Sequence, residues 1–319
     1  MKLLLVSTNE AGQRLDKLLV KYLNEAPKSF IYKMLRKKNI TLNGKKASGS
    51  ELLVLGDEVR LFFSDETFDK FHTSTYQKAS RKLDILYEDD HILLINKPAG
   101  MLSQRADGPE QSLVEYLITY LIESKAMTQE QLASFHPSVC NRLDRNTSGI
   151  VVAGKSLTGL QEMSRLLGER TMHKYYRCIV SGRMTGNCRL NGYLKKNHGT
   201  NQVQILKAPE DGALPIETEY RVLAYGEGVT LLEVLLITGR SHQIRAHLAS
   251  IGHPIIGDPK YGKQGTNERY SRAYHIRYQL LHAYRLEFPD IEGTLSYLSG
   301  KSFTAPVPEI YQKLVPYEG

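Results

Sequence analysis

Residues 64–82, SDETFDKFHTSTYQKASRK, are polar and lack any regular spacing of apolar side chains. Segments with regular apolar spacing lie on both sides of this stretch, which favours two separately packed units over one continuous core. With 319 residues, the chain is long enough for one small and one large unit. We therefore expect a small domain at residues 1–63, a linker at 64–82 and a larger domain at 83–319.

The small domain is expected to combine two helices with a β-hairpin. Apolar residues in RLDKLLVKY recur at i, i+3, i+4 and i+7, which predicts a helix with one buried face. A second helix is expected to begin near residue 28, with Ser29 as its cap. The segment ITLNGKK carries an Asn-Gly pair between two short strand-like arms, a pattern typical of a tight hairpin.

The chain carries an excess of positive charge, part of which is concentrated in the small domain. Lysine and arginine exceed aspartate and glutamate by 42 − 34 = 8, and residues 26–50 contain seven lysines or arginines and no acid. These charges could simply form a solvated helix face. The lack of intervening acids favours a surface that contacts RNA phosphates instead. The residues expected to contact RNA are Lys33, Arg36, Lys37, Lys38, Lys45 and Lys46.

Short strand-like runs dominate residues 83–319. The segment LDILYEDDHILLINK reads as two strands around an acidic turn, and VTLLEVLLITG reads as a further strand. Helices are expected near residues 112–124 and 156–170. Because many of the strands are joined by short connections, we expect an α+β fold with a mixed, mainly antiparallel sheet and helices packed on one side.

Several kinds of site and location are disfavoured. Cys140, Cys178 and Cys188 show no CxxC spacing, so neither a disulfide framework nor a zinc site is expected. GDPKYGK matches GxxxxGK, but Pro259 lacks an amide hydrogen and Gln264 stands where a phosphate-binding loop needs serine or threonine. Four apolar residues after Lys2 are too few for a signal peptide, and no run approaches the ~20 residues that span a bilayer. A reduced, cytoplasmic protein without a membrane partner is expected.

A single acid stands before the apolar run in NRLDRNTSGIVVAG. Asp144 lies between Arg142 and Arg145, with no second acid close by. An aspartate at a strand entrance is commonly a turn former or an ion-pair partner. Positive neighbours, however, lower the pKa of a carboxylate by ~1–3 units and keep it ionised, as a nucleophile or electrostatic stabiliser requires. Glycoside hydrolysis of the ordinary kind uses two carboxylates and is therefore disfavoured.

A second polar cluster lies in ITGRSHQIRAHLASIGHPIIGD. A short helix is expected here with Ser241 as its cap, which would place Arg245 near a helix start, where it suits an anion or a carboxylate. An ordinary surface arginine is the alternative. His242, His247 and Asp258 are of metal-ligating types. Histidines five residues apart point in different directions on a helix, so a metal-dependent hydrolase is not expected.

The segments NRLDRNTSGIVVAG, KYYRCIVSG, LLEVLLITGRSHQIRAHLASIGHPIIGD and LLHAYRLEF, in this order and spacing, resemble the RluA-type pseudouridine synthases. The resemblance covers most of residues 83–310. The basic helix and LNGKK hairpin of the small domain resemble the S4 RNA-binding domain. Together these features imply the RluC/RluD-like branch, whose members modify 23S ribosomal RNA of the large subunit.

The resemblance also assigns roles to individual residues. It implies that Asp144 is the catalytic aspartate, that Arg245 pairs with it, and that Tyr176 stacks on the target uracil. Arg142 would occupy the base stack when the target nucleotide is turned out. Asn141 stands where the family usually has histidine. The reaction implied breaks the N1–C1′ bond of uridine and rejoins the uracil through C5, without a metal or another cofactor.

Two questions stay open at this point. Asp144 could start the reaction by attacking C1′ or by removing the 2′-proton, and both routes need an ionised carboxylate. The chain could instead be a catalytically inert RNA-binding ribosome-assembly factor. Such a protein is expected to lack the aspartate, tyrosine or arginine, all of which are present. We expect a monomer whose partner is ribosomal RNA, and local residue patterns do not specify the target uridine.

Overall fold

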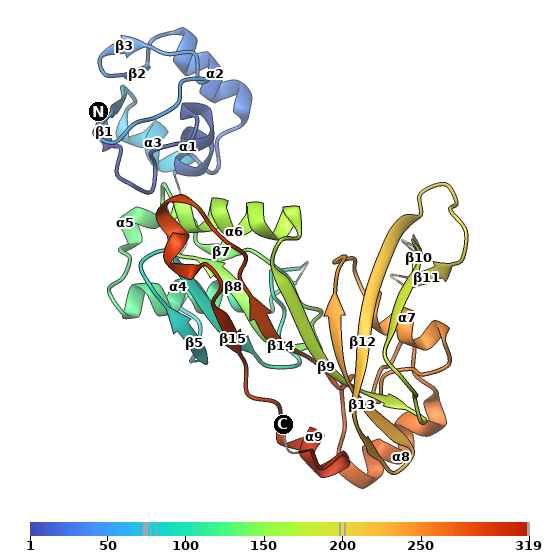
Figure 1. Cartoon of the computed structure of the whole chain (residues 1–319). Coiled ribbons are helices and arrows are strands. Elements are labelled where there is room, and N and C mark those ends of the chain that lie inside the picture. Colours follow the sequence, from blue (N-terminus) through green and yellow to red (C-terminus); the bar gives the residue numbers. More distant parts are fainter. Residues whose placement is uncertain are drawn as a thin grey trace.

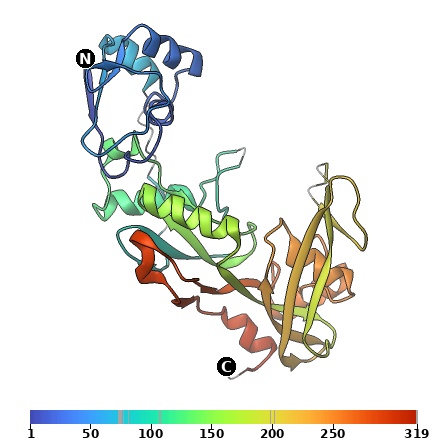
Figure 2. The same cartoon turned by 45° about the horizontal axis from the view of Figure 1, so that its top comes forward.

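The computed structural model describes residues 1–72, 76, 78–80, 82–106, 108–197, 199–200 and 202–317. Figures 1 and 2 show an N-terminal unit, in blue, beside one end of a larger and elongated part of the chain. The two parts touch where the Ser134 hydroxyl donates to Glu10 Oε1 at 2.5 Å and the Leu157 amide donates to Asn9 Oδ1 at 3.3 Å. No helix in the described part of the chain is both long and apolar enough to cross a bilayer.

The N-terminal unit has its own sheet and its own core. Its strands are hydrogen-bonded in the order β1–β4–β2–β3, each pair antiparallel. Leucines of the first helix and Ile31, Met34 and Leu35 of the second pack against this sheet. The elements are β1 (Lys2–Leu5), α1 (Leu15–Tyr22), α2 (Lys28–Arg36), β2 (Ile40–Leu42), β3 (Lys45–Lys46), β4 (Glu58–Leu61) and α3 (Asp65–Phe71).

The local predictions for this unit hold, with one difference in a cap. The hairpin turns at Asn43 and Gly44, whose φ angles of +50° and +73° are those that an Asn-Gly turn adopts readily. Helix α2 begins at Lys28 with Pro27 before it, and no side chain caps it. Ser29 therefore lies inside the first turn, because proline, with its fixed φ, already suits a helix start.

The expected linker at 64–82 begins with a helix. Ser64 caps α3 by accepting the Thr67 amide, and Phe68 is buried in the core of the N-terminal unit. His72 Nδ1 lies 2.6 Å from the carbonyl oxygen of Tyr22, which ties the end of α3 to α1. The seven residues of α3 contain one apolar pair, too few to reveal helical periodicity in the sequence. Part of the remaining linker, at residues 73–75, 77 and 81, lies outside the described residues.

The larger part of the chain is built on one mixed sheet. Its strands follow the order β11–β10–β12–β13–β9–β14–β8–β6–β5, with β15 paired to β14 and β7 to β8. The pair β14–β8 is parallel and the other pairs are antiparallel, which confirms the predicted α+β class. The strands are β5 (Ile85–Glu88), β6 (Ile92–Lys97), β7 (Ser138–Val139), β8 (Ser148–Gly154), β9 (His173–Ser181), β10 (Cys188–Asn197), β11 (Gln202–Leu206), β12 (Leu214–Gly226), β13 (Val229–Leu236), β14 (Leu281–Glu287) and β15 (Ser302–Thr304).

Helices cover both faces of this sheet, so the expectation of helices on one side is wrong. Ile92 and Leu94 of β6 share an apolar cluster with α6, whereas Leu93 and Ile95 share another with α4. Alternate residues of a strand face opposite sides, so both faces are buried. The helices are α4 (Leu113–Glu123), α5 (Gln129–Leu132), α6 (Leu157–Glu169), α7 (Gln243–Ser250), α8 (Gln264–Tyr274), a 3-10 helix (Gly293–Leu298) and α9 (Glu309–Leu314).

The parallel contact between β8 and β14 depends on Gly149. Its φ is +108°, and a Cβ at this position would lie 2.2 Å from the carbonyl oxygen of Ala283, its partner on β14. Contacts of that length do not occur between such atoms, and a side chain would force the strands apart. Because β8 begins directly after the loop that carries Asp144, this contact also fixes the point at which that loop joins the sheet.

We expect Gly149→Ala to lower the free energy of unfolding by more than about 2 kcal/mol, because the added methyl group overlaps the backbone of β14. Gly168→Ala is the control: no atom lies within 4 Å of that Cβ, on an exposed part of α6. The control should be neutral or stabilising by up to about 1 kcal/mol. Urea unfolding of the two variants measures the difference, and equal midpoints would contradict the packing described.

Candidate active site

Asp144 lies in the loop that enters β8. The Thr147 amide donates to the carbonyl oxygen of Asp144 at 3.0 Å, which closes a turn directly before the strand. The side chain of Asp144 is 28% exposed, so it is reachable from solvent yet partly shielded. Its Oδ2 accepts a hydrogen bond from Arg245, whereas Oδ1 has no hydrogen-bond partner among the described residues.

Arg245 holds this oxygen from the opposite segment of the chain. It lies in the first turn of α7, its side chain is 5% exposed, and its Nη1 donates to Asp144 Oδ2 at 2.7 Å. Helix α7 starts at Gln243 with His242 as its N-cap, not with a Ser241 side-chain cap as expected. The predicted contact between Asp144 and Arg245 is present, across 101 residues of sequence.

The guanidinium of Arg245 is shared with a second acid, Asp258. Arg245 Nε and Nη2 donate to the two carboxylate oxygens of Asp258 at 2.7 and 2.8 Å, a bidentate geometry that fixes the plane of the guanidinium. Asp258 is fully buried and also accepts the amides of Lys260 and Tyr261. Burial opposes the charge, but Asp258 and Asp144 together raise the pKa of Arg245 above its usual value.

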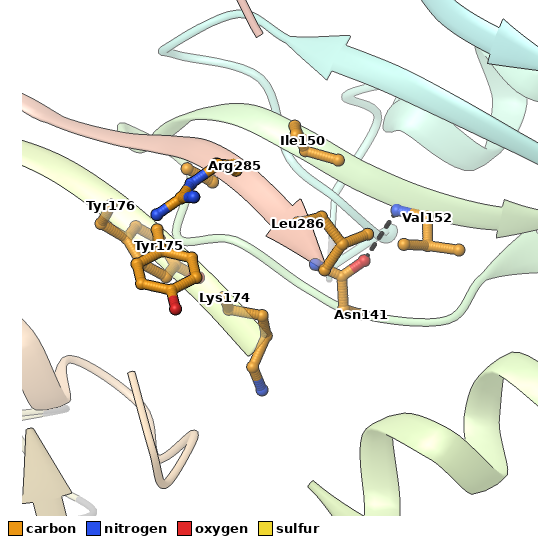
Figure 3. A pocket seen from close by; sticks show the side chains of 9 residues that line it. Asn141, Ile150, Val152, Lys174, Tyr175, Tyr176, Arg285 and Leu286 are labelled. Atoms are coloured by element: carbon orange, nitrogen blue, oxygen red, sulfur yellow. Dashed lines mark hydrogen bonds between the residues drawn. The ribbon is translucent and has the colours of Figure 1, made fainter. Parts of the chain in front are cut away.

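Tyr176 faces Asp144, and its neighbour Tyr175 does not. Tyr176 lies on β9 and is 7% exposed, and its burial together with the charge of Asp144 raises the pKa of its hydroxyl. Tyr175 points to the other side of the strand, where the guanidinium of Arg285 lies 3.9 Å from its ring centroid (Figure 3). The alternation along β9 therefore leaves Tyr176 as the tyrosine beside the aspartate.

Two buried polar side chains fix the loop on either side of Asp144. Lys97 is fully buried, and its Nζ donates to the carbonyl oxygens of Pro98, Met101 and Arg145 at 2.9–3.0 Å. Ser103 donates to the Leu143 carbonyl and accepts the Leu143 amide. Burial lowers the pKa of Lys97 to about 7, while the charge of Asp144 acts in the opposite direction. Hydrogen bonds from Lys97 and Ser103 thus fix the backbone of the residues on both sides of Asp144, Leu143 and Arg145.

The two arginines beside Asp144 in the sequence do not hold its carboxylate. Arg145 donates to Glu110 at 2.9 Å and to the carbonyl oxygen of Gly100 at 3.2 Å, so the sequence expectation for this residue is wrong. Neighbours in an extended loop point in different directions, and only the tertiary fold selects the partner. Arg142 is exposed and has no ion pair among the described residues. Asn141 accepts the Val152 amide at 2.8 Å, so it anchors the loop to β8 (Figure 3).

The histidines of the second cluster have separate partners. His242 Nδ1 lies 2.9 Å from the Tyr261 hydroxyl, and His247 Nδ1 lies 3.0 Å from that of Thr218. Within the described residues, no group of three His, Cys, Asp or Glu side chains is arranged to hold a metal ion. Asp258, considered as a metal ligand in the sequence, is the second partner of Arg245 instead.

A small cavity lies beside the loop that carries Asp144, but Asp144 does not line it. It measures about 10 Å³, and Asn141, Lys174, Tyr175, Tyr176 and Arg285 contribute to its wall (Figure 3). That volume holds at most about one water molecule. Burial lowers the pKa of Lys174, which lies two residues before Tyr176 on the same face of β9. The cavity marks the edge of the site but cannot admit a nucleotide.

The basic residues expected to contact RNA all lie on the N-terminal unit. Two of them occupy the exposed face of α2, opposite its buried apolar residues, two follow directly after α2, and two form β3. None has an ion-pair partner among the described residues. The structure therefore does not bring them together with Asp144, which belongs to the larger sheet. These residues are Lys33, Arg36, Lys37, Lys38, Lys45 and Lys46.

Four residues of the site were not predicted to belong to it. Asp258 and His242 were considered only as metal ligands, and Tyr261 lies in the GDPKYGK segment that resembles a phosphate-binding loop. Lys97, in INKPAG, had no assigned role. A lysine inside an apolar strand is rare unless it is paired, and that was the one available signal for Lys97.

The site thus combines an aspartate at the entrance of β8, a helix arginine paired with it and a buried tyrosine nearby. Residues 91–250 match the RNA pseudouridylate synthase family. The chain belongs to this family, which confirms the membership predicted from its motifs.

Several curated relatives are similar over nearly the whole chain. Ribosomal large subunit pseudouridine synthase C of Vibrio vulnificus is 31% identical over 319 residues, covering 97% of this chain and 94% of the relative. The protein of the same name from Escherichia coli is 32% identical, covering 90% of this chain and 88% of the relative. The structure of human RNA pseudouridylate synthase domain containing 4 has the same fold, with a TM-score of 0.57 at 21% identity. It covers 72% of this chain and 90% of the human chain.

We expect Arg245→Met to lower the free energy of unfolding by about 3–5 kcal/mol, because it leaves the Asp258 carboxylate buried without its cation. The double variant Arg245→Met/Asp258→Asn removes that charge and should recover part of the loss. Urea unfolding of both variants at neutral pH measures the two values. A single variant as stable as the wild type would contradict the buried ion pair.

Proposed function

We propose that this chain isomerises uridine to pseudouridine in large-subunit (23S) ribosomal RNA and that Asp144 is its catalytic residue. The observation that carries the proposal is the hydrogen bonding of the two carboxylate oxygens of Asp144. Its Oδ2 accepts a hydrogen bond from Arg245 at 2.7 Å, while Oδ1 has no hydrogen-bond partner in the described part of the chain and the side chain is partly exposed. Family membership supplies the reaction, and the names of the relatives support this RNA as the substrate.

The reaction rearranges bonds within one nucleotide. The N1–C1′ bond breaks, the uracil turns within the site, a C5–C1′ bond forms, and the C5 hydrogen leaves as a proton while N1 gains one. An ionised Asp144 starts the sequence in one of two ways. It attacks C1′ and forms an ester bond that breaks when the C5–C1′ bond forms, or it removes the 2′-proton, which returns to C2′ in that same step. Arg245 serves both routes, because a cation fixed beside the carboxylate favours its charged form.

The target uridine must leave its base stack to reach Asp144. Turning a base out costs a few kcal/mol. We assign Tyr176 to contact with the extruded uracil, since a base stacked on an aromatic ring gains about 1–3 kcal/mol. Arg142, exposed two residues before Asp144, is assigned to the space that the base leaves in the RNA.

The N-terminal unit is assigned to RNA binding, in the manner of an S4 domain. The six lysines and arginines assigned to this role lie on α2, directly after it and on β3; they are exposed and have no ion-pair partner among the described residues. Phosphate contacts of this kind supply affinity without selecting a base. We propose that the protein acts as a monomer, without a metal or other cofactor, in the cytoplasm where ribosomal RNA is assembled.

We expect Asp144→Asn to abolish tritium release from [5-³H]uridine-labelled large-subunit ribosomal RNA, with a rate reduced at least about 10³-fold because the neutral amide neither attacks C1′ nor accepts a proton. Asp211→Asn, in an exposed turn, is the control and should retain full release.

The same assay tests the alternative of an inert ribosome-assembly factor. A wild-type protein that binds this RNA but releases no tritium would support the inert factor and contradict the proposed enzyme. Full release by Asp144→Asn would leave the enzyme but remove the assigned catalytic residue.

We expect the triple variant Lys33→Gln/Arg36→Gln/Lys37→Gln to bind RNA more weakly and with a shallower salt dependence. Each lost phosphate contact should reduce the slope of log affinity against log salt by roughly 0.7–0.9. Filter binding at salt concentrations from about 50 to about 200 mM measures this slope. Arg272→Gln, on the exposed face of α8 and paired with Glu268, is the control. An unchanged slope in the triple variant would exclude this face from RNA contact.

A further inference from the structure

His242 occupies an unusual place beside the catalytic carboxylate. It is the N-cap of α7, in a left-handed backbone conformation with φ of 56° and ψ of 13°, and its side chain is 11% exposed. Its Nε2 lies 3.9 Å from Asp144 Oδ2, the oxygen that Arg245 already holds. A residue other than glycine in this conformation is uncommon, which marks a position where the surrounding structure dictates the backbone.

The other ring nitrogen of His242 is fixed by Tyr261. The Tyr261 hydroxyl lies 2.9 Å from His242 Nδ1 and accepts the amide of Val203, on β11, at 2.9 Å. With one lone pair of the hydroxyl used in this way, its hydrogen is best placed by donating to Nδ1. The ring of His242 therefore accepts at Nδ1 and carries its hydrogen on Nε2.

Electrostatics favour the same tautomer. A lone pair on Nε2 would face the Asp144 carboxylate, whereas an N–H there is attracted to it. Burial lowers the pKa of His242, with Arg245 and Lys260 acting in the same direction and the two carboxylates opposing it, so the ring is neutral near pH 7. Because the nitrogen that faces the site carries a hydrogen, His242 is a donor there and not a general base.

We propose that His242 is a positioning residue that donates its Nε2–H to Oδ2 of Asp144 when the target nucleotide is bound. The present separation of 3.9 Å exceeds a hydrogen bond by less than 1 Å, and such contacts commonly tighten once substrate fills a site. Oδ2 would then have two donors, Arg245 and His242, and Oδ1 would be the oxygen directed at the sugar. This inference rests on the proposed function of Asp144.

Two substitutions of His242 separate positioning from a structural role. His242→Asn suits the left-handed backbone and can accept the Tyr261 hydrogen through Oδ1, but its amide is too short to reach Asp144. His242→Gln is longer and places an amide N–H near the original Nε2. In steady-state tritium release from labelled large-subunit ribosomal RNA, we expect His242→Asn to lower kcat about 10- to 100-fold with KM within about a factor of three. The Gln variant should recover most of that loss.

Tyr261→Phe tests the source of the tautomer. It removes the hydroxyl that fixes His242 and should lower kcat by a smaller factor than His242→Asn. The double variant Tyr261→Phe/His242→Asn should be no slower than His242→Asn alone, because both substitutions interrupt one chain of hydrogen bonds. If the reductions in kcat of the two single variants multiply in the double variant, the two residues act independently, and the proposed chain of hydrogen bonds from Tyr261 through His242 to Asp144 is overturned.

The result is distinguishable from a failure of the proposed function. Asp144→Asn is measured in parallel, and thermal unfolding verifies that each variant is folded. If the wild type is active and Asp144→Asn is not, the function stands. Equal activity of His242→Asn and the wild type would then overturn the role of His242 alone, as would a loss confined to KM. Equal reductions of kcat in His242→Asn and His242→Gln would assign His242 a structural role and overturn the proposed hydrogen bond.

Discussion

The bidentate pair between Arg245 and the buried Asp258 is the interaction on which the site depends. Asp258 takes up two of the guanidinium nitrogens and leaves the third to contact Asp144. A lysine could not contact both carboxylates in a fixed geometry, because its single ammonium group lacks the planar arrangement of donors that a guanidinium has. The protein thus orients the guanidinium that faces Asp144 before any RNA binds. Of the two carboxylate oxygens of Asp144, Oδ2 is hydrogen-bonded to Arg245 and Oδ1 has no partner among the described residues.

The backbone around Asp144 is organised by the same principle of a buried polar group with several partners. Lys97 is fully buried, and its Nζ donates to three carbonyl oxygens, those of Pro98, Met101 and Arg145. Such a group is costly to bury alone and stable when fully satisfied. Asp144 therefore lies on a short segment whose backbone is fixed on both sides. The catalytic role proposed for it requires this, because groups that are already oriented need not reorganise during a reaction.

The sequence predicted the features that follow from local pattern or from motif order. The amphipathic spacing of α1, the Asn-Gly hairpin and the helix expected near residues 112–124, which is α4, are local features. The resemblance of ordered motifs anticipated the contact between Asp144 and Arg245. Residues whose role depends on a distant partner were not predicted. Asp258 was considered only as a metal ligand, Arg145 pairs with Glu110 instead of Asp144, and α3 is stabilised by the core that it covers. Their partners are fixed only by the complete fold.

The position of β14 gives the sheet an order of assembly. In the ladder it stands between β9, which carries Tyr176, and β8, which follows Asp144, yet it begins only at Leu281 (Figure 1). A chain grows from its N-terminus, so every residue assigned to chemistry is synthesised before the strand that joins the two halves. A nascent or prematurely terminated chain lacking β14 would hold the complete set of reactive side chains without the geometry to use them.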